Sequence, residues 1–298
     1  MLLDKLLSNL AVEVQPFAVC QVSNGWRLRL PGPSGTMLHF VLEGGGVIRC
    51  LKGGQHPLKP YSLSVVPKGL AHTLEPHGRI FDELRIDSPP PGDKVCHIAA
   101  GPEGESGIVL SCGLIKVKYG ESLGLFDHLH DILTADFSEA PQVKEIFSSI
   151  VSEQSQSLSG SDTITASLMT ACVVHLLRQL TEQNEEQLPW LVALGDGRLG
   201  RAIDKILEDP AAMHSVESLA NVASMSRSAF AEKFTAAFKH SPMQFVHQLR
   251  MFRSAKLLHE DRYSIDEIAH KIGYSSRSHF SEAFKKQYGK SPAAYRAA

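Results

Sequence analysis

The chain has 298 residues, enough for two domains, and a formal net charge of −2. Its 43% hydrophobic and 21% charged residues are typical of a soluble globular protein. We expect no transmembrane helix, because no run of 18 apolar residues occurs, and no signal peptide, because the first ten residues lack a basic segment and a cleavage site. Five scattered cysteines without a C-x-x-C pair indicate a reducing cytoplasm and argue against a disulfide scaffold or zinc finger.

The charge is distributed unevenly along the chain. Residues 197–298 hold 16 Lys and Arg against 10 Asp and Glu, a net charge of +6. Residues 1–196 hold the remaining 14 basic and 22 acidic residues, a net charge of −8. A basic C-terminal third predicts a polyanionic partner for that part, although a solvated basic surface would have the same composition.

Residues 25–87 have the pattern of a small β-barrel or sandwich. Short apolar runs such as "MLHFVLE" and "YSLSVVP" alternate with glycine- and proline-rich turns such as "PGPSG" and "KGGQ". We expect a loop at 88–93 and one or two further strands within 94–119. The first part of the chain is therefore expected to be mainly β-structure.

Helical spacing of apolar residues begins after this region, at 142–156 and 163–183. In the second segment Ile164, Leu168, Cys172 and Leu176 form a row four residues apart that Leu180 continues. This row predicts either a homodimer seam or packing onto the chain's own β-domain. The polar segment 181–189 ends in proline and is the expected linker, which gives predicted domains at 1–188 and 189–298.

The C-terminal part contains the same short sequence twice, "SRSAFAEKF" at 226–234 and "SRSHFSEAF" at 276–284. The similarity extends over 215–245 and 264–295. Each copy starts with a serine N-cap, continues with a short helix and a tight turn, and then has a second helix with phenylalanines four residues apart. This pattern predicts two helix-turn-helix units, at about 215–238 and 264–288, joined by a long helix that spaces them roughly one DNA turn, about 34 Å, apart.

The duplicated unit, the linking helix and the segment "IAHKIGYSSRSHFSEAFKKQYGKSPAAYR" resemble the AraC/XylS family of bacterial transcription regulators. The resemblance covers about 198–296. It implies a cytoplasmic regulator, usually an activator, that binds double-stranded DNA, contacts RNA polymerase and forms a homodimer. It predicts the fold class α+β, with a β-barrel sensor and accessory helices followed by an all-α DNA-binding domain.

With the phenylalanines buried, each recognition helix presents its opposite face to DNA. The resemblance implies base contacts from the second, fifth and sixth residues of each helix, which are Ser228, Ala231 and Glu232 in the first and Ser278, Ser281 and Glu282 in the second; the exposed faces add the basic residues Arg227, Arg277 and Lys285. The predicted DNA-binding residues are Arg227, Ser228, Ala231, Glu232, Arg277, Ser278, Ser281, Glu282 and Lys285. An ion pair of Glu282 with Lys286 is the structural alternative for that glutamate, and Lys233 is expected to contact phosphate.

Residues 39–75 resemble a cupin barrel, and "PKGLAH" at 67–72 fits the second cupin motif. The first motif is incomplete, because only His39 and Glu43 lie near the expected positions. His39, Glu43 and His72 are candidate metal ligands, but a structural role for the histidines is favoured and we expect no metal or other cofactor. The resemblance implies a sensor without enzyme activity; a metal-dependent enzyme and a ligand-free dimer scaffold are the alternatives.

Two hypotheses for the signal remain open, a small organic effector and an oxidant. Cys20 and Cys112 occupy places similar to those of cysteines in oxidant-sensing relatives of this type. An exposed thiolate of low pKa that is oxidised and then captured by a second cysteine would form a redox switch. The alternative is that both are small apolar core residues.

Overall fold

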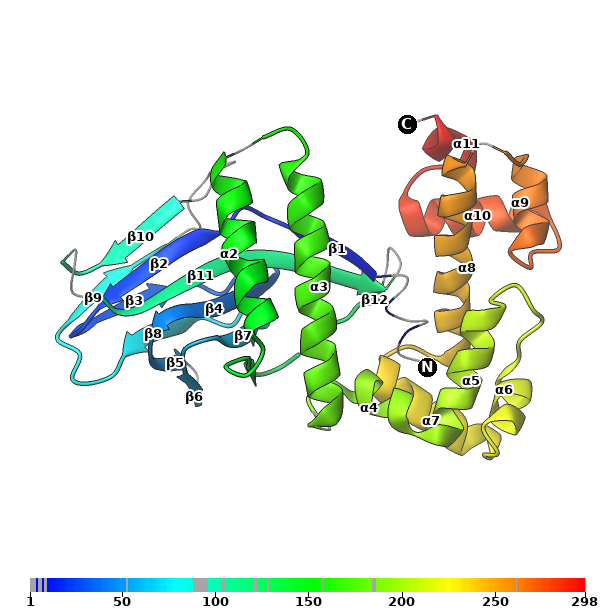
Figure 1. Ribbon diagram of the computed structural model, residues 1–298. Coiled ribbons are helices and arrows are strands. Elements are labelled where there is room, and N and C mark those ends of the chain that lie inside the picture. Colours follow the sequence, from blue (N-terminus) through cyan, green and yellow to red (C-terminus); the bar gives the residue numbers. More distant parts are fainter. Residues whose placement is uncertain are drawn as a thin grey trace. The chain divides into compact units, whose positions relative to one another are not determined.

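The computed structural model describes Asp4, Leu7 and residues 10–51, 53–87, 96–102, 106–119, 123–127, 129–156, 158–183, 186–260 and 262–297. The loop predicted at 88–93 lies outside these residues. The chain forms two compact units, one comprising residues 11–118 and 124–187, the other residues 188–298 with two short earlier segments. The predicted α+β class is confirmed, because strands dominate the first unit and helices the second (Figure 1).

Two sheets form the N-terminal unit (Figure 1). The larger sheet has the order β10-β2-β11-β4-β7-β13, with β1 and β12 also paired to β11, and the smaller has the order β6-β5-β8-β3-β9. The strands are β1 (Leu10–Val14), β2 (Ala18–Ser23), β3 (Trp26–Leu30), β4 (Thr36–Gly44), β5 (Gly46–Cys50), β6 (Gln55–Leu58), β7 (Ser62–Val66), β8 (His72–Pro76), β9 (Asp82–Arg85), β10 (Cys96–Ala100), β11 (Ser106–Tyr119), β12 (Leu123–Gly124) and β13 (Leu133–Asp136).

The main core lies where these two sheets face each other. Val22 and Leu110 from the larger sheet pack in one cluster with Leu28, Ile48 and Leu74 from the smaller sheet. All five side chains are fully buried. Because both sheets bury one face in this cluster, the polar groups that lie inside it are shielded from water.

Two helices, α2 (Pro141–Gln156) and α3 (Ser161–Glu182), lie side by side against the larger sheet (Figure 1). Phe147 of α2 stacks on Phe40 of β4 with ring centroids 4.0 Å apart. Phe17 is the third ring of this cluster, and it lies over Gly113, where any Cβ would overlap it. The second core therefore holds α2 on the outer face of the sheet.

The predicted apolar row of α3 is divided between the inside and the surface. Cys172, Leu176 and Leu180 are buried, whereas Ile164 is 46% exposed. A strict four-residue row turns about 40° per step around a helix, so its two ends cannot share one face. Within the described residues, α3 is also the one helix long and apolar enough to cross a membrane by length and composition, but a core helix passes the same test.

The C-terminal unit consists of short helices around one longer helix, α8 (Figure 1). They are α4 (Pro189–Gly195), α5 (Gly197–Glu208), α6 (Val216–Val222), α7 (Arg227–Phe238), α8 (Pro242–His259), α9 (Ile265–Lys271), α10 (Arg277–Tyr288) and α11 (Pro292–Arg296). The pairs α6–α7 and α9–α10 are the two predicted helix-turn-helix units, and α8 connects them.

Serine caps start the helices of both units, as the sequence predicts. Ser264 forms a reciprocal capping box with Glu267, and Ser215 forms a second one with Ser218. The turns between the paired helices each contain one residue with positive φ, Ser224 at 54° in the first unit and Gly273 at 83° in the second. The one-residue difference in turn length therefore leaves the turn geometry similar.

Candidate nucleic-acid interface and sensor site

The first recognition helix, α7, is positioned by its cap and its two phenylalanines. The hydroxyl of Ser226 accepts a hydrogen bond from the Ala229 N–H at the start of the helix. Phe230 and Phe234 are fully buried on one face, where Phe234 also packs edge-to-face against Phe245 of α8. The opposite face is thereby left to solvent.

The second recognition helix, α10, repeats this arrangement. Ser276 caps it by accepting the His279 N–H, and Phe280 and Phe284 are fully buried at 5.6 Å between ring centroids. Tyr274 packs edge-to-face on Phe280 and its hydroxyl hydrogen-bonds His247 Nδ1 of α8 at 2.8 Å. Both recognition helices are thus fixed on the same central helix.

The predicted DNA-binding residues lie on the free faces of these two helices. The exposed ones are Arg227, Ser228, Glu232, Arg277, Ser278, Glu282 and Lys285, and the half-buried ones are Ala231 and Ser281. Seven side chains can therefore reach a partner without rearrangement of the helices. Their contacts with DNA remain predictions, since exposure is a requirement for base contact and does not demonstrate it.

The structure distinguishes two charged residues on these helices, Lys233 and Glu282, by whether they form an ion pair within the protein. Lys233 Nζ lies 3.7 Å from Asp196, the N-cap of α5, so this lysine is engaged within the protein. In the described part of the chain, no ion pair joins Glu282 to Lys286, so the structural alternative for that glutamate has no support. Glu282 is available for contact with a cytosine amino group.

Two arginines that were not predicted from the sequence form hydrogen bonds to the turns of the helix-turn-helix units. Arg201 of α5 donates to the Val222 carbonyl at 3.2 Å and to the Ser224 hydroxyl at 3.4 Å. Arg250 of α8 donates to carbonyls of the α5–α6 connection and of Gly273. Nothing in the local sequence marks these bonds, because their acceptors, backbone carbonyls and the Ser224 hydroxyl, lie more than 20 residues away in the sequence.

In the N-terminal unit, strand pairing brings Cys112, His39 and His72 into one buried chain of hydrogen bonds. Cys112 and His39 are cross-strand partners, and Cys112 Sγ lies 3.0 Å from His39 Nδ1. His39 Nε2 lies 2.8 Å from His72 Nε2, and His72 Nδ1 lies 2.9 Å from the Leu70 carbonyl oxygen. All three side chains lie within the core between strands β4, β8 and β11.

The Leu70 carbonyl determines the proton positions along this chain. A carbonyl oxygen only accepts, so His72 carries its proton on Nδ1 and accepts at Nε2. His39 must then donate from Nε2, which leaves Nδ1 to accept the Cys112 S–H. Burial lowers the pKa of both histidines, that of His39 well below its usual value, so the neutral forms that this assignment requires are favoured.

Cys20 lies next to this chain of hydrogen bonds. It belongs to β2, the strand that pairs with β11, which carries Cys112. The cross-strand partner of Cys20 is Leu110, which places Cys20 and Cys112 diagonally on the same face. Burial raises the pKa of Cys112 well above its usual value, and contact with the Cys20 thiol and the nearby Cys96 raises it further. The expectation of an exposed thiolate of low pKa is therefore wrong for Cys112, because the closed barrel favours its neutral thiol.

The metal-ligand candidates are only partly assembled. His39 and His72 meet directly, but Glu43 is exposed near the end of β4. Among the contacts of the described residues, none joins Glu43 to either imidazole. These three residues therefore do not form a common ligand set in this structure.

Models of known protein families match both the N-terminal and the C-terminal part of the chain. A model of the cupin family matches residues 2–182, and a model of the helix-turn-helix domain family matches residues 219–298. The chain belongs to the AraC/XylS family of transcription regulators and carries a cupin domain. This AraC-family regulator is 26% identical over 300 residues to the HTH-type transcriptional regulator MtrA of Neisseria gonorrhoeae, covering 99% of this chain and 97% of that protein.

Two further relatives are similar over most of this regulator. The HTH-type transcriptional regulator AlkR of Acinetobacter baylyi is 26% identical, with 99% of this chain and 98% of that protein covered. The RCS-specific HTH-type transcriptional activator RclR of Escherichia coli is 23% identical, with 93% and 90% covered. Among solved structures, the AdpA DNA-binding domain in complex with target DNA is 35% identical and covers 33% of this chain and 88% of that one, with a TM-score of 0.32.

Proposed function

We propose that this AraC-family regulator binds a specific DNA sequence through α7 and α10 and activates transcription when its cupin domain receives a chemical signal. The observation that carries the proposal is the duplicated helix-turn-helix unit, in which matching faces stay exposed while the phenylalanines hold each helix on α8. A side chain on such a face can enter the major groove and contact base edges. The activator role is supported by the relative RclR, which is named an activator.

The proposed partners are double-stranded DNA, a second copy of the chain and RNA polymerase. The basic C-terminal part, with its net charge of +6, supplies the electrostatic attraction to DNA. A homodimer would place four helix-turn-helix units on the operator, and activation requires contact with the polymerase. These proposals follow the AraC family, and the cytoplasm is the proposed location.

Binding to the DNA upstream of its own gene tests the function. Fluorescence anisotropy at one stated salt concentration should show binding at least about 10³-fold tighter than to unrelated DNA. Arg277→Ala should weaken specific binding strongly, whereas Arg253→Ala, on an exposed position of α8, should lower the affinity for specific and unrelated DNA by a similar small factor. Equal affinity for specific and unrelated DNA, or an unchanged affinity of Arg277→Ala, would contradict the proposal.

The contacts of Cys112 with Cys20 and His39 favour the hypothesis that the cupin domain responds to an oxidant. As the Cys112 sulfur attacks one oxygen of a peroxide-class oxidant, His39 Nδ1 takes the thiol proton and the O–O bond breaks. The released oxygen fragment then takes this proton from His39, which returns to its neutral form. The Cys20 sulfur then attacks the sulfenic acid, an S–S bond forms, and hydroxide leaves as water with the Cys20 proton. Two thiols are oxidised by two electrons, and the peroxide is reduced to water and an alcohol or a second water.

Thiol mass mapping together with anisotropy tests this signal. Peroxide treatment should link Cys20 to Cys112 and change DNA affinity by about fivefold or more. Cys112→Ser should abolish both effects, and the matched variant Cys172→Ser, which alters a buried cysteine of α3, should keep them. Free thiols and unchanged affinity after oxidation would reject the oxidant hypothesis and favour a small organic effector.

A further inference from the structure

The β5–β6 hairpin places a cysteine and a histidine on the same face. Ile48 pairs with His56 and Arg49 with Gln55, and the Cys50 N–H donates to the Gly54 carbonyl at 3.1 Å. Cys50 and His56 are therefore diagonal neighbours on the face that also carries the buried Ile48. Their separation of six residues in the sequence becomes a close side-chain approach only because this hairpin has this register.

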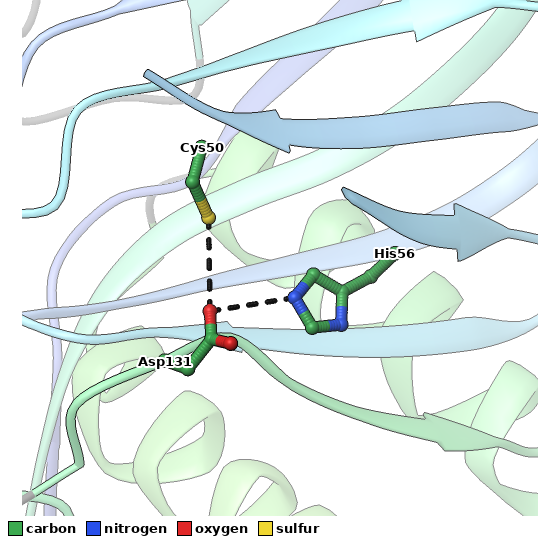
Figure 2. A group of neighbouring side chains, drawn as sticks. All are labelled: Cys50, His56 and Asp131. Atoms are coloured by element: carbon green, nitrogen blue, oxygen red, sulfur yellow. Dashed lines mark hydrogen bonds and ion pairs between the residues drawn. The ribbon is translucent and has the colours of Figure 1, made fainter. Parts of the chain in front are cut away.

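A carboxylate from a distant part of the chain completes the group. Asp131 precedes β13, and its Oδ1 is held by the backbone N–H of Ile132 at 2.7 Å. This oxygen lies 3.7 Å from Cys50 Sγ and 3.4 Å from His56 Nε2. Figure 2 shows both side chains facing this one oxygen. The three candidate ligand atoms all lie within 4.8 Å of one another.

Two of these separations, from the Asp131 oxygen to the Cys50 sulfur and to the His56 nitrogen, match edges of a metal tetrahedron. A zinc ion bonded at about 2.3 Å to sulfur and about 2.0 Å to nitrogen and oxygen separates its S and O ligands by roughly 3.5 Å and its N and O ligands by roughly 3.3 Å. The observed 3.7 Å and 3.4 Å differ from these values by a few tenths of an ångström. The N–O separation is longer than the 2.7–3.2 Å of an ordinary N–H···O hydrogen bond.

Burial supplies a second, independent observation. The ring atom His56 Nε2 is inaccessible to water and makes no hydrogen bond, although the His56 side chain as a whole is 21% exposed and Asp131 Oδ1 lies 3.4 Å away. A buried ring nitrogen without a partner is costly, and a cation between it and the carboxylate would satisfy it. Asp131 is 54% exposed, so this carboxylate is accessible from solvent.

We propose that Cys50, His56 and Asp131 form a binding site for a zinc-class divalent cation, with water at the fourth position. Binding breaks the Cys50 S–H bond, forms the sulfur–metal bond and releases the proton to solvent. Thiolate, imidazole and carboxylate together are typical zinc ligands and are unsuited to Mg²⁺ or Ca²⁺, which prefer oxygen ligands alone. The site would tie the β5–β6 hairpin to the segment that leads into β13.

The site also lies next to the buried hydrogen-bond chain of Cys112, His39 and His72, here called the sensor network. Cys50 is the cross-strand partner of His72, whose imidazole accepts from His39. A cation held by Cys50 would therefore fix β5, the strand paired with β8 at His72. His72 belongs to the hydrogen-bond chain that runs through His39 to Cys112. The proposal goes beyond DNA binding and thiol oxidation and can succeed or fail independently of both.

Cobalt titration of the reduced full-length protein tests the site, because Co²⁺ replaces zinc in such sites and absorbs light. One equivalent should produce a near-ultraviolet sulfur-to-cobalt charge-transfer band and tetrahedral d–d bands, and Zn²⁺ should displace both. Cys50→Ser should abolish the charge-transfer band. Asp131→Asn should weaken cobalt binding by about tenfold or more; asparagine keeps the side-chain oxygen that accepts the Ile132 N–H, and the position is exposed.

Matched variants separate this site from other thiols and imidazoles. Cys96→Ser and His97→Gln, on β10, should bind cobalt as the unaltered protein does. Loss of the band in Cys112→Ser with retention in Cys50→Ser would place the metal in the sensor network and overturn the proposal. Absence of a charge-transfer band in the unaltered protein, or equal affinity in Asp131→Asn, would overturn it as well.

Discussion

Arg250 donates its Nε–H to the Pro210 carbonyl oxygen across 2.7 Å, which joins α8 to the connection between α5 and α6. The same guanidinium donates to Ala212 at 2.8 Å and to Gly273 at 3.3 Å. Pro210 and Ala212 precede the first helix-turn-helix unit, and Gly273 forms the turn of the second. One side chain therefore binds both units, and Gly273 allows the close approach because a Cβ there would overlap the Ala211 carbonyl.

Arg250→Ala should loosen the two recognition helices from each other. It leaves several carbonyls without a charged donor, so we expect the free energy of unfolding of the C-terminal unit to fall by about 1–3 kcal/mol. Affinity for DNA with both half-sites should fall more than affinity for DNA with one half-site, because the spacing of the two helices matters only for the former. Urea unfolding and anisotropy with the two DNA lengths measure these effects.

The matched control for this prediction is Arg253→Ala, which removes an exposed arginine from the same helix. It should lower affinity for both DNA lengths by a similar small factor and leave stability nearly unchanged. If Arg250→Ala weakened both DNA lengths equally, Arg250 would have no role in the spacing of the units.

Glu282→Gln should relax base preference at one position of the operator. An exposed glutamate on a recognition helix can only accept and so favours the cytosine amino group, whereas a glutamine amide both accepts and donates; the substitution should reduce discrimination there by about 1–3 kcal/mol. Affinity for unrelated DNA should rise, because a negative charge is removed near phosphates. Binding to operators with single-base changes measures the effect; Glu260→Gln, at the end of α8, should keep the full base preference.

Lys285→Ala should change the salt dependence of binding and leave the sequence preference intact. If Lys285 contacts one phosphate, the slope of log affinity against log salt should become less steep by about 0.9. Anisotropy at several salt concentrations gives this slope. A loss of preference at one base pair would instead show that Lys285 contacts a base.

The sequence predicted the helix-turn-helix units well because their determinants are local. Phe230 and Phe234 are four residues apart, so their common burial follows from helix geometry alone. The serine caps are equally local, since Ser264 and Glu267 satisfy each other within one turn. Exposure of the predicted recognition faces followed from these two features.

The Cys112–His39–His72 hydrogen-bond chain could not be predicted to the same extent, because strand register decides it. His39 meets Cys112 across 73 residues of sequence, and a register irregularity between Val109 and Leu110 lies in the same strand pair. A shift by one residue would turn these side chains to the opposite face. The approach of Asp131 to Cys50 likewise depends on how the segment before β13 returns to the small sheet.

Stability of the cupin domain should fall when the pH drops below about 6.5. Burial lowers the pKa of His39 and His72 in the folded state, so the unfolded chain takes up protons first as the pH decreases. Each histidine contributes up to about 1.4 kcal/mol of lost stability per pH unit between its unfolded pKa, about 6.5, and its lowered folded pKa. Above about pH 7.5 this dependence should disappear.

Urea unfolding at pH 7.5 and pH 5.5 measures this dependence, with Trp26 as the reporter of the cupin domain. Trp190→Phe removes the other of the two tryptophans, which belongs to α4.

Relative to this background, His39→Gln should reduce the loss of stability between the two pH values by about 1 kcal/mol, because one of the two buried titrating groups is gone. His97→Gln, on an exposed position of β10, should leave it unchanged. An equal loss in His39→Gln and the background protein would mean that folding does not lower the pKa of His39, contrary to the effect expected from its burial.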